Sequence, residues 1–251
     1  MALGIAAAIG FGPESQLRAQ TDEIQVYDAR IAAPGVFNLT WHDNFTPDGR
    51  TVPDFPGGVV PNHALNGVPE WAYGVAPWME AGLYLPLYTY AADGSLTFNG
   101  FKLRALFVKP DAAHQRFFYG LNFEFSYNTS HWDPNRYTQE IRPIIGWHLG
   151  PFDLIVNPIL DNSYKSFSQL DFAPASRLAY NLNARWALAA EEYDDIGPLR
   201  KFLPANAQVH QLYGVVDHAG HPWSIEGGIG FGLTGAGDRV VLKLILSRDL
   251  N

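Results

Sequence analysis

The stretch that decides the fold is Phe117-Phe118-Tyr119-Gly120-Leu121-Asn122-Phe123-Glu124-Phe125-Ser126-Tyr127. Its odd positions are all apolar or aromatic, whereas the even positions from Gly120 onward are glycine, asparagine, glutamate and serine. Successive side chains of a β-strand point to opposite faces, so a period of two indicates a strand whose two faces meet different surroundings.

The same alternation recurs along the chain from residue 36 onward. It predicts twelve strands, at about 36–46, 70–76, 79–91, 96–108, 117–127, 137–149, 152–161, 169–182, 185–193, 208–217, 222–233 and 239–249.

The composition of the polar face decides between a soluble and a membrane protein. A soluble sandwich exposes a face that is usually rich in Lys, Glu and Thr, but here the polar face carries glycine, asparagine, tyrosine and a few charges of both signs. Alternating segments of roughly ten residues separated by turns are typical of a barrel with a lipid-facing exterior and a polar lumen. We therefore predict an all-β fold, an antiparallel up-and-down transmembrane β-barrel of about twelve strands.

Composition excludes several other classes. The 251 residues are 47% hydrophobic, 14% aromatic and only 17% charged, with no cysteine. So many aromatic residues exclude a disordered chain, and the absence of cysteine excludes disulfides and thiolate chemistry. The longest apolar stretch, at residues 2–12, is too short for a transmembrane helix. A net charge of -8 with scattered basic residues indicates no nucleic-acid partner.

The N-terminus has the features of an export signal. Residues 2–12 have the length of the apolar core of a signal peptide, and Ala19 offers a small residue for cleavage. We interpret residues 1–19 as a signal peptide. No basic residue precedes the core, which is explained either by a truncated start or by the alternative, a short buried helix. Residues 20–35 are then expected to form a periplasmic lead-in, followed by a single barrel domain over 36–251.

Connection lengths predict an orientation. Tight turns are expected at Ala76-Pro77, Gly150-Pro151, near Asn183 and at residues 218–221, and longer loops at 47–69, 128–136, 162–168 and 194–207. Outer-membrane barrels have an even number of strands with short periplasmic turns, which places both termini in the periplasm. Residues 23–27 also alternate, but a thirteenth strand would break this parity. Outer-membrane lipid and lipopolysaccharide are the expected surroundings.

Hairpin parity gives registers that a structure can test. Across Gly150-Pro151, Leu149 is expected opposite Phe152 and His148 opposite Asp153. In the last hairpin, Phe231 is expected opposite Leu242, which sets Gly230 opposite Lys243 and Glu226 opposite Ser247.

Inward-facing charges form the candidate site. With turn centres near residues 113 and 133, Lys102 is expected opposite Glu124, Glu124 opposite Arg142, and Asn122 opposite Arg104. The predicted lumen ladder consists of Glu80, Lys102, Arg104, Glu124, Glu140 and Arg142. Other residues expected to face the lumen are His42, His148, Asp153, Glu226 and Lys243. Such a ladder can be a salt-bridge network that fills the lumen, a selectivity filter for polar solutes, or a proton-transfer site.

One local motif resembles a known group. Tyr73-Gly74-Val75 followed by Trp78-Met79-Glu80-Ala81-Gly82-Leu83-Tyr84-Leu85-Pro86-Leu87 is similar to a signature of small proteobacterial outer-membrane barrels. These include the group described as phenol-degradation meta-pathway transporters. The resemblance implies an envelope location and transport, and it supplies no catalytic residue. The final Asn251 departs from the aromatic last residue usual in such barrels.

Motifs for catalysis or for cofactors are missing from the sequence. There is no Gly-x-Ser-x-Gly elbow, phosphate loop or zinc-protease motif, and the pair His218 and His221 lacks a third ligand at a typical spacing. The glycine-rich residues 227–232 alternate as a strand and indicate close packing or a bend in the wall. We expect no cofactor, no metal and no enzymatic activity, with an outer-membrane lipid hydrolase as the alternative.

Three functional hypotheses follow. The first is a passive channel or transporter in the outer membrane for small solutes, with a small polar solute as the partner. The second is a structural or adhesive barrel with a plugged lumen. The third is a soluble periplasmic sandwich or lipocalin-like binder, in which Phe117, Tyr119, Phe123 and Leu244 would face a packed protein core. Whether residues 47–69 fold outward or into the lumen stays open.

Overall fold

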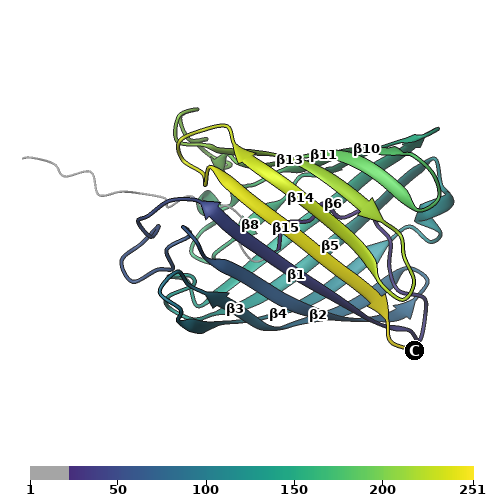
Figure 1. The fold of residues 1–251 in the computed structure, drawn as a ribbon, viewed down its shortest axis with the longest axis horizontal. Coiled ribbons are helices and arrows are strands. Elements are labelled where there is room, and N and C mark those ends of the chain that lie inside the picture. Colours follow the sequence, from purple (N-terminus) through teal and green to yellow (C-terminus); the bar gives the residue numbers. More distant parts are fainter. Residues whose placement is uncertain (1–22) are drawn as a thin grey trace, which may run out of the picture.

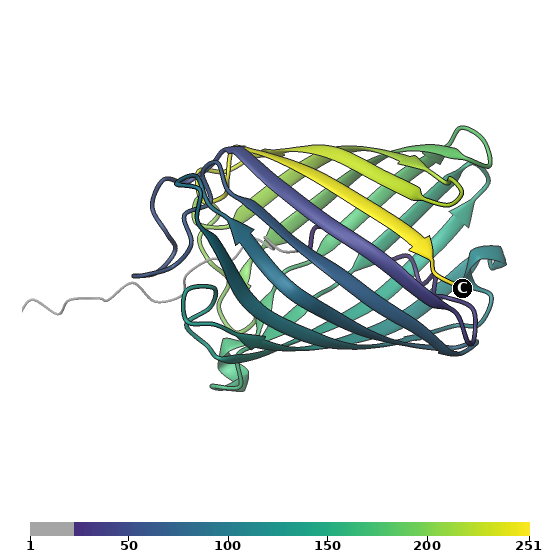
Figure 2. The same ribbon diagram turned by 60° about the horizontal axis from the view of Figure 1, so that its bottom comes forward.

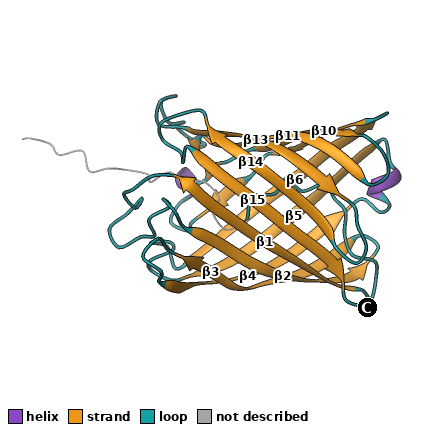
Figure 3. Cartoon of the chain, in the orientation of Figure 1, coloured by secondary structure: helices purple, strands orange, loops and turns teal. Residues whose placement is uncertain are grey.

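A computed structural model describes residues 23–251 and shows a β-barrel with almost no helix (Figures 1 and 3). The predicted signal peptide, residues 1–19, lies outside the described part. The first six strands are β1 (Phe37–Asp48), β2 (Leu65–Ala76), β3 (Met79–Tyr90), β4 (Leu96–Val108), β5 (Phe117–Asn128) and β6 (Tyr137–Leu149). Then come β7 (Phe152–Asn157), β8 (Leu160–Asn162), β9 (Asp171–Phe172), β10 (Ala175–Asn181), β11 (Trp186–Asp195), β12 (Gly197–Pro198), β13 (Val209–His218), β14 (Ser224–Gly232) and β15 (Val240–Asp249).

Fifteen strand segments make a closed barrel of twelve antiparallel strands. β6 pairs with β7 along one half and with β8 along the other, so β7 and β8 form one interrupted strand. Two further strands of the barrel are interrupted in the same way: one consists of β9 and β10, and the other of β11 and β12. β1 pairs with β15 through Trp41 opposite Leu246, which closes the wall. The predicted fold class is confirmed.

The two ends of the barrel differ. Short turns and the C-terminus lie at one end, which we call the turn end, and the longer loops gather at the other, the loop end (Figure 3). Two short 3-10 helices, η1 (Ala112–His114) and η2 (Phe167–Gln169), lie in connections. Among residues 23–251, no helix has the length and apolar character needed to cross a membrane.

The predicted bounds of β2 are wrong. The strand begins at Leu65, opposite Phe45, and not at residue 70. Gly67 and Pro69 interrupt the alternation that would mark it, and the pairing of β2 with β3 is irregular between Gly67 and Glu70. The loop between β1 and β2 is therefore shorter than the predicted 47–69.

That loop stays at the rim of the loop end. Val59 N donates to His131 O at 3.1 Å, in the loop between β5 and β6. Arg50 N donates to Asp238 Oδ1 at 2.8 Å, in the loop between β14 and β15. The loop is thus attached to connections on both sides of its own hairpin.

Residues in the hairpins lie on their predicted faces, but some of them are paired with a different residue of the neighbouring strand than predicted. Leu149 lies opposite Phe152 and His148 opposite Asp153, as predicted. In the last hairpin Ile229, not Phe231, lies opposite Leu242, because Gly232 N donates to Arg239 O at 3.1 Å and the turn centre therefore lies one residue earlier than predicted. Lys243 is consequently opposite Gly228, and Ser247 is opposite Ser224.

The charge ladder shows the same kind of displacement. Arg104, not Lys102, lies opposite Glu124, and Asn122 lies opposite Arg142. Glu124 faces Glu140. Each turn centre is one residue from its predicted place, which moves the register by two and leaves every side chain on its predicted face.

The outer face of the wall is apolar. The exposed large side chains include Trp71, Leu103, Phe117, Tyr119, Leu188, Ile229 and Leu244. Tyr119 is 54% exposed and Phe117 is 42% exposed, which contradicts the soluble-binder hypothesis, where both would be buried. A continuous apolar exterior on a closed barrel is the surface that a lipid bilayer requires.

The inner face is less polar than predicted. Leu106, Phe118 and Ile144 point inward and are buried in one cluster with Ile24 and Tyr27 from the N-terminal segment. The barrel interior therefore contains a packed apolar core beside its charges. Inward glycines make room for it: a Cβ on Gly146 would lie 2.1 Å from the ring of Phe118.

Spin labels on single cysteines introduced at two neighbouring positions of β5 test the orientation of the wall. A label at Phe125 should be accessible to dissolved oxygen, because that side chain is 38% exposed on the apolar face, whereas a label at Ser126, which is 8% exposed, should be shielded. The chain has no cysteine of its own, so each label reports one site. An immobile, oxygen-inaccessible label at Phe125 would contradict the membrane barrel.

Candidate functional site

The lumen of the barrel is occupied by the chain's own N-terminal residues. We call residues 23–34 the lumen segment; Figure 2 shows this purple trace inside the wall before it turns into β1 (Figure 2). Glu23, Ile24, Val26 and Tyr27 are each at most 5% exposed. The predicted periplasmic lead-in over 20–35 therefore does not match the described part of that range, because these side chains bury themselves among inward-facing residues of the wall.

Side chains of the wall hold the backbone of the lumen segment. Asn157 accepts from Tyr27 N at 2.7 Å and donates to Tyr27 O at 3.0 Å. Its side-chain amide thus makes the two hydrogen bonds that the backbone of a neighbouring strand would otherwise make. Arg142 Nη1 donates to Gln25 O at 2.9 Å, and Lys243 Nζ donates to Ile24 O at 3.2 Å. Each of these bonds uses a side chain of the barrel and leaves the backbone ladder of the wall intact.

Tyr27 is the centre of the contact. Its hydroxyl lies 2.5 Å from that of Tyr84 and donates to Glu124 Oε1 at 3.2 Å. The guanidinium carbon of Arg142 lies 4.3 Å from the centre of the Tyr27 ring, within the range of a cation–π interaction.

The family-like motif contributes to the same contact. Glu80 Oε2 accepts from Ala32 N at 2.5 Å. A Cβ on Gly74 would lie 2.1 Å from Ala33 O, and a Cβ on Gly82 would lie 2.8 Å from Arg104 Nε. The two glycines thus provide space for the lumen segment and for Arg104, and the glutamate binds the segment directly.

The first group of charges lies on β2 to β6 and contains the whole predicted ladder. Arg104 Nη2 lies 2.6 Å from Glu70 Oε1 and also contacts Glu80, and Lys102 Nζ lies 3.6 Å from Glu124 Oε2. Arg142 binds Glu140 through two hydrogen bonds of 2.6 and 2.9 Å.

His42 lies on the inner face, as expected, with Nε2 3.3 Å from Glu70 Oε2. The predicted set does not include Glu70, because the alternation of β2 is recognisable only from that residue onward. The alternation of β1, which is opposite β2, would have located it.

The second group of charges lies on β10, β11 and β13 to β15, and only two of its members, Glu226 and Lys243, are among the residues predicted to face the lumen. Lys243 Nζ contacts Glu191 and lies 2.6 Å from Glu226 Oε1. Arg177 contacts Glu191 and Asp217 and lies 3.7 Å from Glu226. Extending the parity of Glu226 and Lys243 to the neighbouring strands would have revealed Arg177 and Glu191.

The pair His148 and Asp153 stands apart from both groups, at the turn end. His148 Nδ1 lies 2.6 Å from Asp153 Oδ1, and Asn181 Nδ2 donates to the other carboxylate oxygen at 2.9 Å. The ring of Phe118 lies 4.8 Å from the imidazole. The pair links two strands across the Gly150-Pro151 turn.

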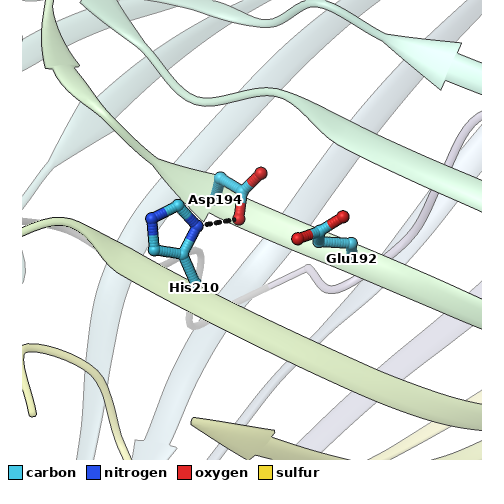
Figure 4. A group of neighbouring side chains, drawn as sticks. All are labelled: Glu192, Asp194 and His210. Carbon is cyan, nitrogen blue, oxygen red and sulfur yellow. Dashed lines mark hydrogen bonds and ion pairs between the residues drawn. The ribbon is translucent and has the colours of Figure 1, made fainter. Parts of the chain in front are cut away.

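A cluster of metal-ligand types lies on the outer face near the loop end. Glu192, Asp194 and His210 have oxygen and nitrogen atoms within 4.8 Å of one another (Figure 4). His210 Nδ1 lies 2.6 Å from Asp194 Oδ1, and its Nε2 lies 3.1 Å from Gln208 Oε1. Both ring nitrogens are therefore already hydrogen-bonded within the protein. The histidine pair singled out in the sequence is elsewhere, with the His218 ring 4.3 Å from Trp186.

Replacing Arg142 with glutamine tests how the lumen segment is held. Glu140 and Glu23 would lose their shared cation and Gln25 O its donor, and breaking a buried ion pair typically costs about 3–5 kcal/mol. The midpoint of denaturant unfolding should fall, and amide hydrogen exchange at residues 24–27 should accelerate more than in the strands. Arg116, exposed at the turn end, provides the control Arg116→Gln, and equal effects of both variants would contradict this assignment.

Comparisons with known proteins describe the fold more than the family. No protein-family model matches the chain, and no curated protein matches it. Among solved structures, the COG4313 outer membrane channel from Pseudomonas putida F1 is similar with a TM-score of 0.58 and 13% identity, covering 91% of this chain and 100% of that one. The translocator domain of the autotransporter NalP from Neisseria meningitidis has a TM-score of 0.47 and 12% identity, covering 86% and 89%. At 13% identity, the likeness to the channel is one of fold alone, that of a closed β-barrel.

Proposed function

We propose that this protein is a passive outer-membrane channel for small solutes, closed in the observed state by its lumen segment. The observation that carries the proposal is the way in which the segment is bound. Its backbone is bound by wall side chains, namely those of Asn157, Arg142, Lys243 and Glu80. The segment can therefore leave without breaking a backbone hydrogen bond of the barrel wall.

The charged side chains of the lumen support a water-filled path through the barrel. In both groups, ion pairs join side chains of the barrel wall to each other: Arg104 to Glu70 and Glu80, and Arg177 to Glu191. These ion pairs therefore persist when the lumen segment leaves. Packed apolar residues are often as stabilising as a buried ion pair, or more so. An interior that served stability alone would have no need of two charged groups, whereas a water-filled path keeps such groups solvated.

The family-level part of the proposal rests on the motif. We infer that the resemblance to the phenol-degradation meta-pathway transporter group reflects a shared way of seating an N-terminal segment, because Gly74 and Glu80 of the motif both contact residues 32–33. The likeness in fold to a protein described as an outer membrane channel supports the same function. We assign no catalytic reaction to the chain.

A permanently sealed structural barrel is the second candidate, and one observation favours it. Ile24, Val26, Tyr27 and Ala29 are buried in the same apolar cluster as inward residues of the wall. Removing them would expose that cluster to water at a cost of roughly 25 cal/mol per Å².

Single-channel recording in planar bilayers distinguishes the two candidates. A variant lacking residues 23–34 should show stable conductance steps, whereas the full chain should show none or only brief openings. Heat-modifiable gel mobility shows first that the variant has kept its barrel. Tyr27→Ala, which removes the ring beneath Arg142 and the bonds to Tyr84 and Glu124, should give more frequent openings in the full chain.

A folded deletion variant that conducts no ions would overturn the channel proposal and establish the sealed barrel. Stable, equal conductance of the full chain and the variant would show that the lumen segment does not close the path.

A further inference from the structure

The outer face near the loop end carries three side chains of metal-ligand type within an apolar surface (Figure 4). Glu192 and Asp194 extend from β11, and His210 of β13 lies directly opposite Asp194. Glu192 lies opposite Leu212, which in turn lies opposite Phe231, and these two apolar side chains are 44% and 49% exposed. Charged groups on such a surface require a compensating charge nearby.

Hydrogen bonds outside the cluster determine which nitrogen of His210 carries a proton. Gln208 Nε2 donates to Leu203 O at 2.7 Å, so the oxygen of the same amide is the atom that faces His210. That oxygen can only accept, and therefore His210 Nε2 donates to Gln208 Oε1, at 3.1 Å. In a neutral imidazole the lone pair is then on Nδ1, which lies 2.6 Å from Asp194 Oδ1. Two lone pairs repel each other at this distance, so a second proton or a metal cation has to lie between them.

The charge of the cluster favours the metal cation. An imidazolium would neutralise only one of the two carboxylates, whereas a divalent ion bound by a neutral imidazole and two carboxylates leaves no net charge on the apolar face. A histidine that binds a metal through one nitrogen almost always donates its other N–H to an acceptor that fixes the orientation of the ring. Gln208 is such an acceptor, and its own orientation is fixed by Leu203 O.

Two other histidines pair with an aspartate in the same way but lack a further ligand. The distance from Nδ1 to Oδ1 is 2.5 Å between His114 and Asp111 and 2.6 Å between His148 and Asp153. Within residues 23–251, only the pair at His210 has another histidine or acidic ligand atom within 4.8 Å, that of Glu192. The third ligand therefore distinguishes this cluster from ordinary His–Asp pairs.

We propose that Glu192, Asp194 and His210 bind a divalent transition-metal ion of the Zn²⁺ type, through one oxygen of each carboxylate and through Nδ1 of the imidazole. Imidazole is a good ligand for Zn²⁺, whereas Mg²⁺ and Ca²⁺ prefer oxygen ligands alone. Ligand atoms of a tetrahedral Zn²⁺ lie about 3.3 Å apart, since each bond is about 2.0 Å long. The observed 2.6 Å within the His–Asp pair and the limit of 4.8 Å for the whole cluster lie on either side of that value.

The ion would join two neighbouring strands at the loop end. Asp194 lies near the end of β11 and His210 near the start of β13, so the bound ion links the two strands on both sides of the loop between them. Gln208 extends this link to Leu203 within the loop. The metal site lies on the outer face and is therefore independent of whether the lumen conducts.

Zn²⁺ binding to the full chain in detergent tests the site, measured by competition with a chromophoric chelator. The unchanged chain should bind one ion that an excess of Mg²⁺ does not displace. Glu192→Gln should weaken the affinity at least about tenfold, because it removes one ligand. His114→Gln removes the exposed pair with Asp111 and is the matched control, which should leave the affinity unchanged.

Nitrogen NMR of the histidine rings identifies the ligand atom. On addition of Zn²⁺, the Nδ1 signal of His210 should move to the position of a metal-bound nitrogen, while Nε2 keeps its hydrogen; His210→Gln assigns the signals. Gln208→Met retains all three ligands but removes the acceptor from Nε2, and it should weaken Zn²⁺ binding about tenfold. Heat-modifiable gel mobility shows that each variant has kept its barrel.

Three results would each overturn the metal site. The first is equal affinity for Zn²⁺ in Glu192→Gln and in the unchanged chain, which would place any bound ion at another group of side chains. The second is a His210 ring that keeps hydrogens on both nitrogens in the presence of Zn²⁺, which would establish an ordinary ion pair with Asp194. The third is loss of affinity in His114→Gln as large as that in Glu192→Gln.

Discussion

Every backbone N–H and C=O group within a bilayer has to be hydrogen-bonded inside the protein, and the rest of this structure depends on that constraint. The pairing of β1 with β15 meets it by removing the last free edges of the sheet. Once the sheet is closed, strand geometry alone determines which residues face lipid and which face the lumen. The apolar exterior and the sparse charges of the chain are both consequences of this division.

Closure also creates an interior that has to be filled or solvated. In this barrel both solutions occur together. Apolar residues such as Leu106 and Ile144 pack around Ile24 and Tyr27, while Arg142 and Lys243 bind the same segment through its carbonyl groups. The lumen segment therefore contacts both the apolar core and the two groups of ion pairs.

The sequence contains enough information for the barrel because a period of two survives almost any local irregularity. It specifies register less well. Moving one turn centre by a single residue changed the partners of Glu124 and Arg142 while leaving both on the inner face. The pattern predicts β2 only from residue 70, because Gly67 and Pro69 interrupt the alternation before it.

The site was predictable only in part, for a related reason. The wall charges on β3 to β6 follow from parity, but the lumen segment does not, since residues 23–27 alternate like a strand and have no hairpin partner. Their place is determined by side chains far away in sequence, such as Asn157 and Arg142. Pattern along the chain carries no information about contacts of that kind.

The way in which the lumen segment is bound bears on why the interior is charged at all. A strand added to the sheet would be held by a continuous ladder and could leave only by unfolding the wall. A segment held by single side chains and one apolar cluster can exchange these contacts for water and counter-ions one at a time. Arg142 binds Glu140 of the wall and also donates to Gln25 O, so the ion pairs of the wall and the attachment of the lumen segment are coupled through one side chain.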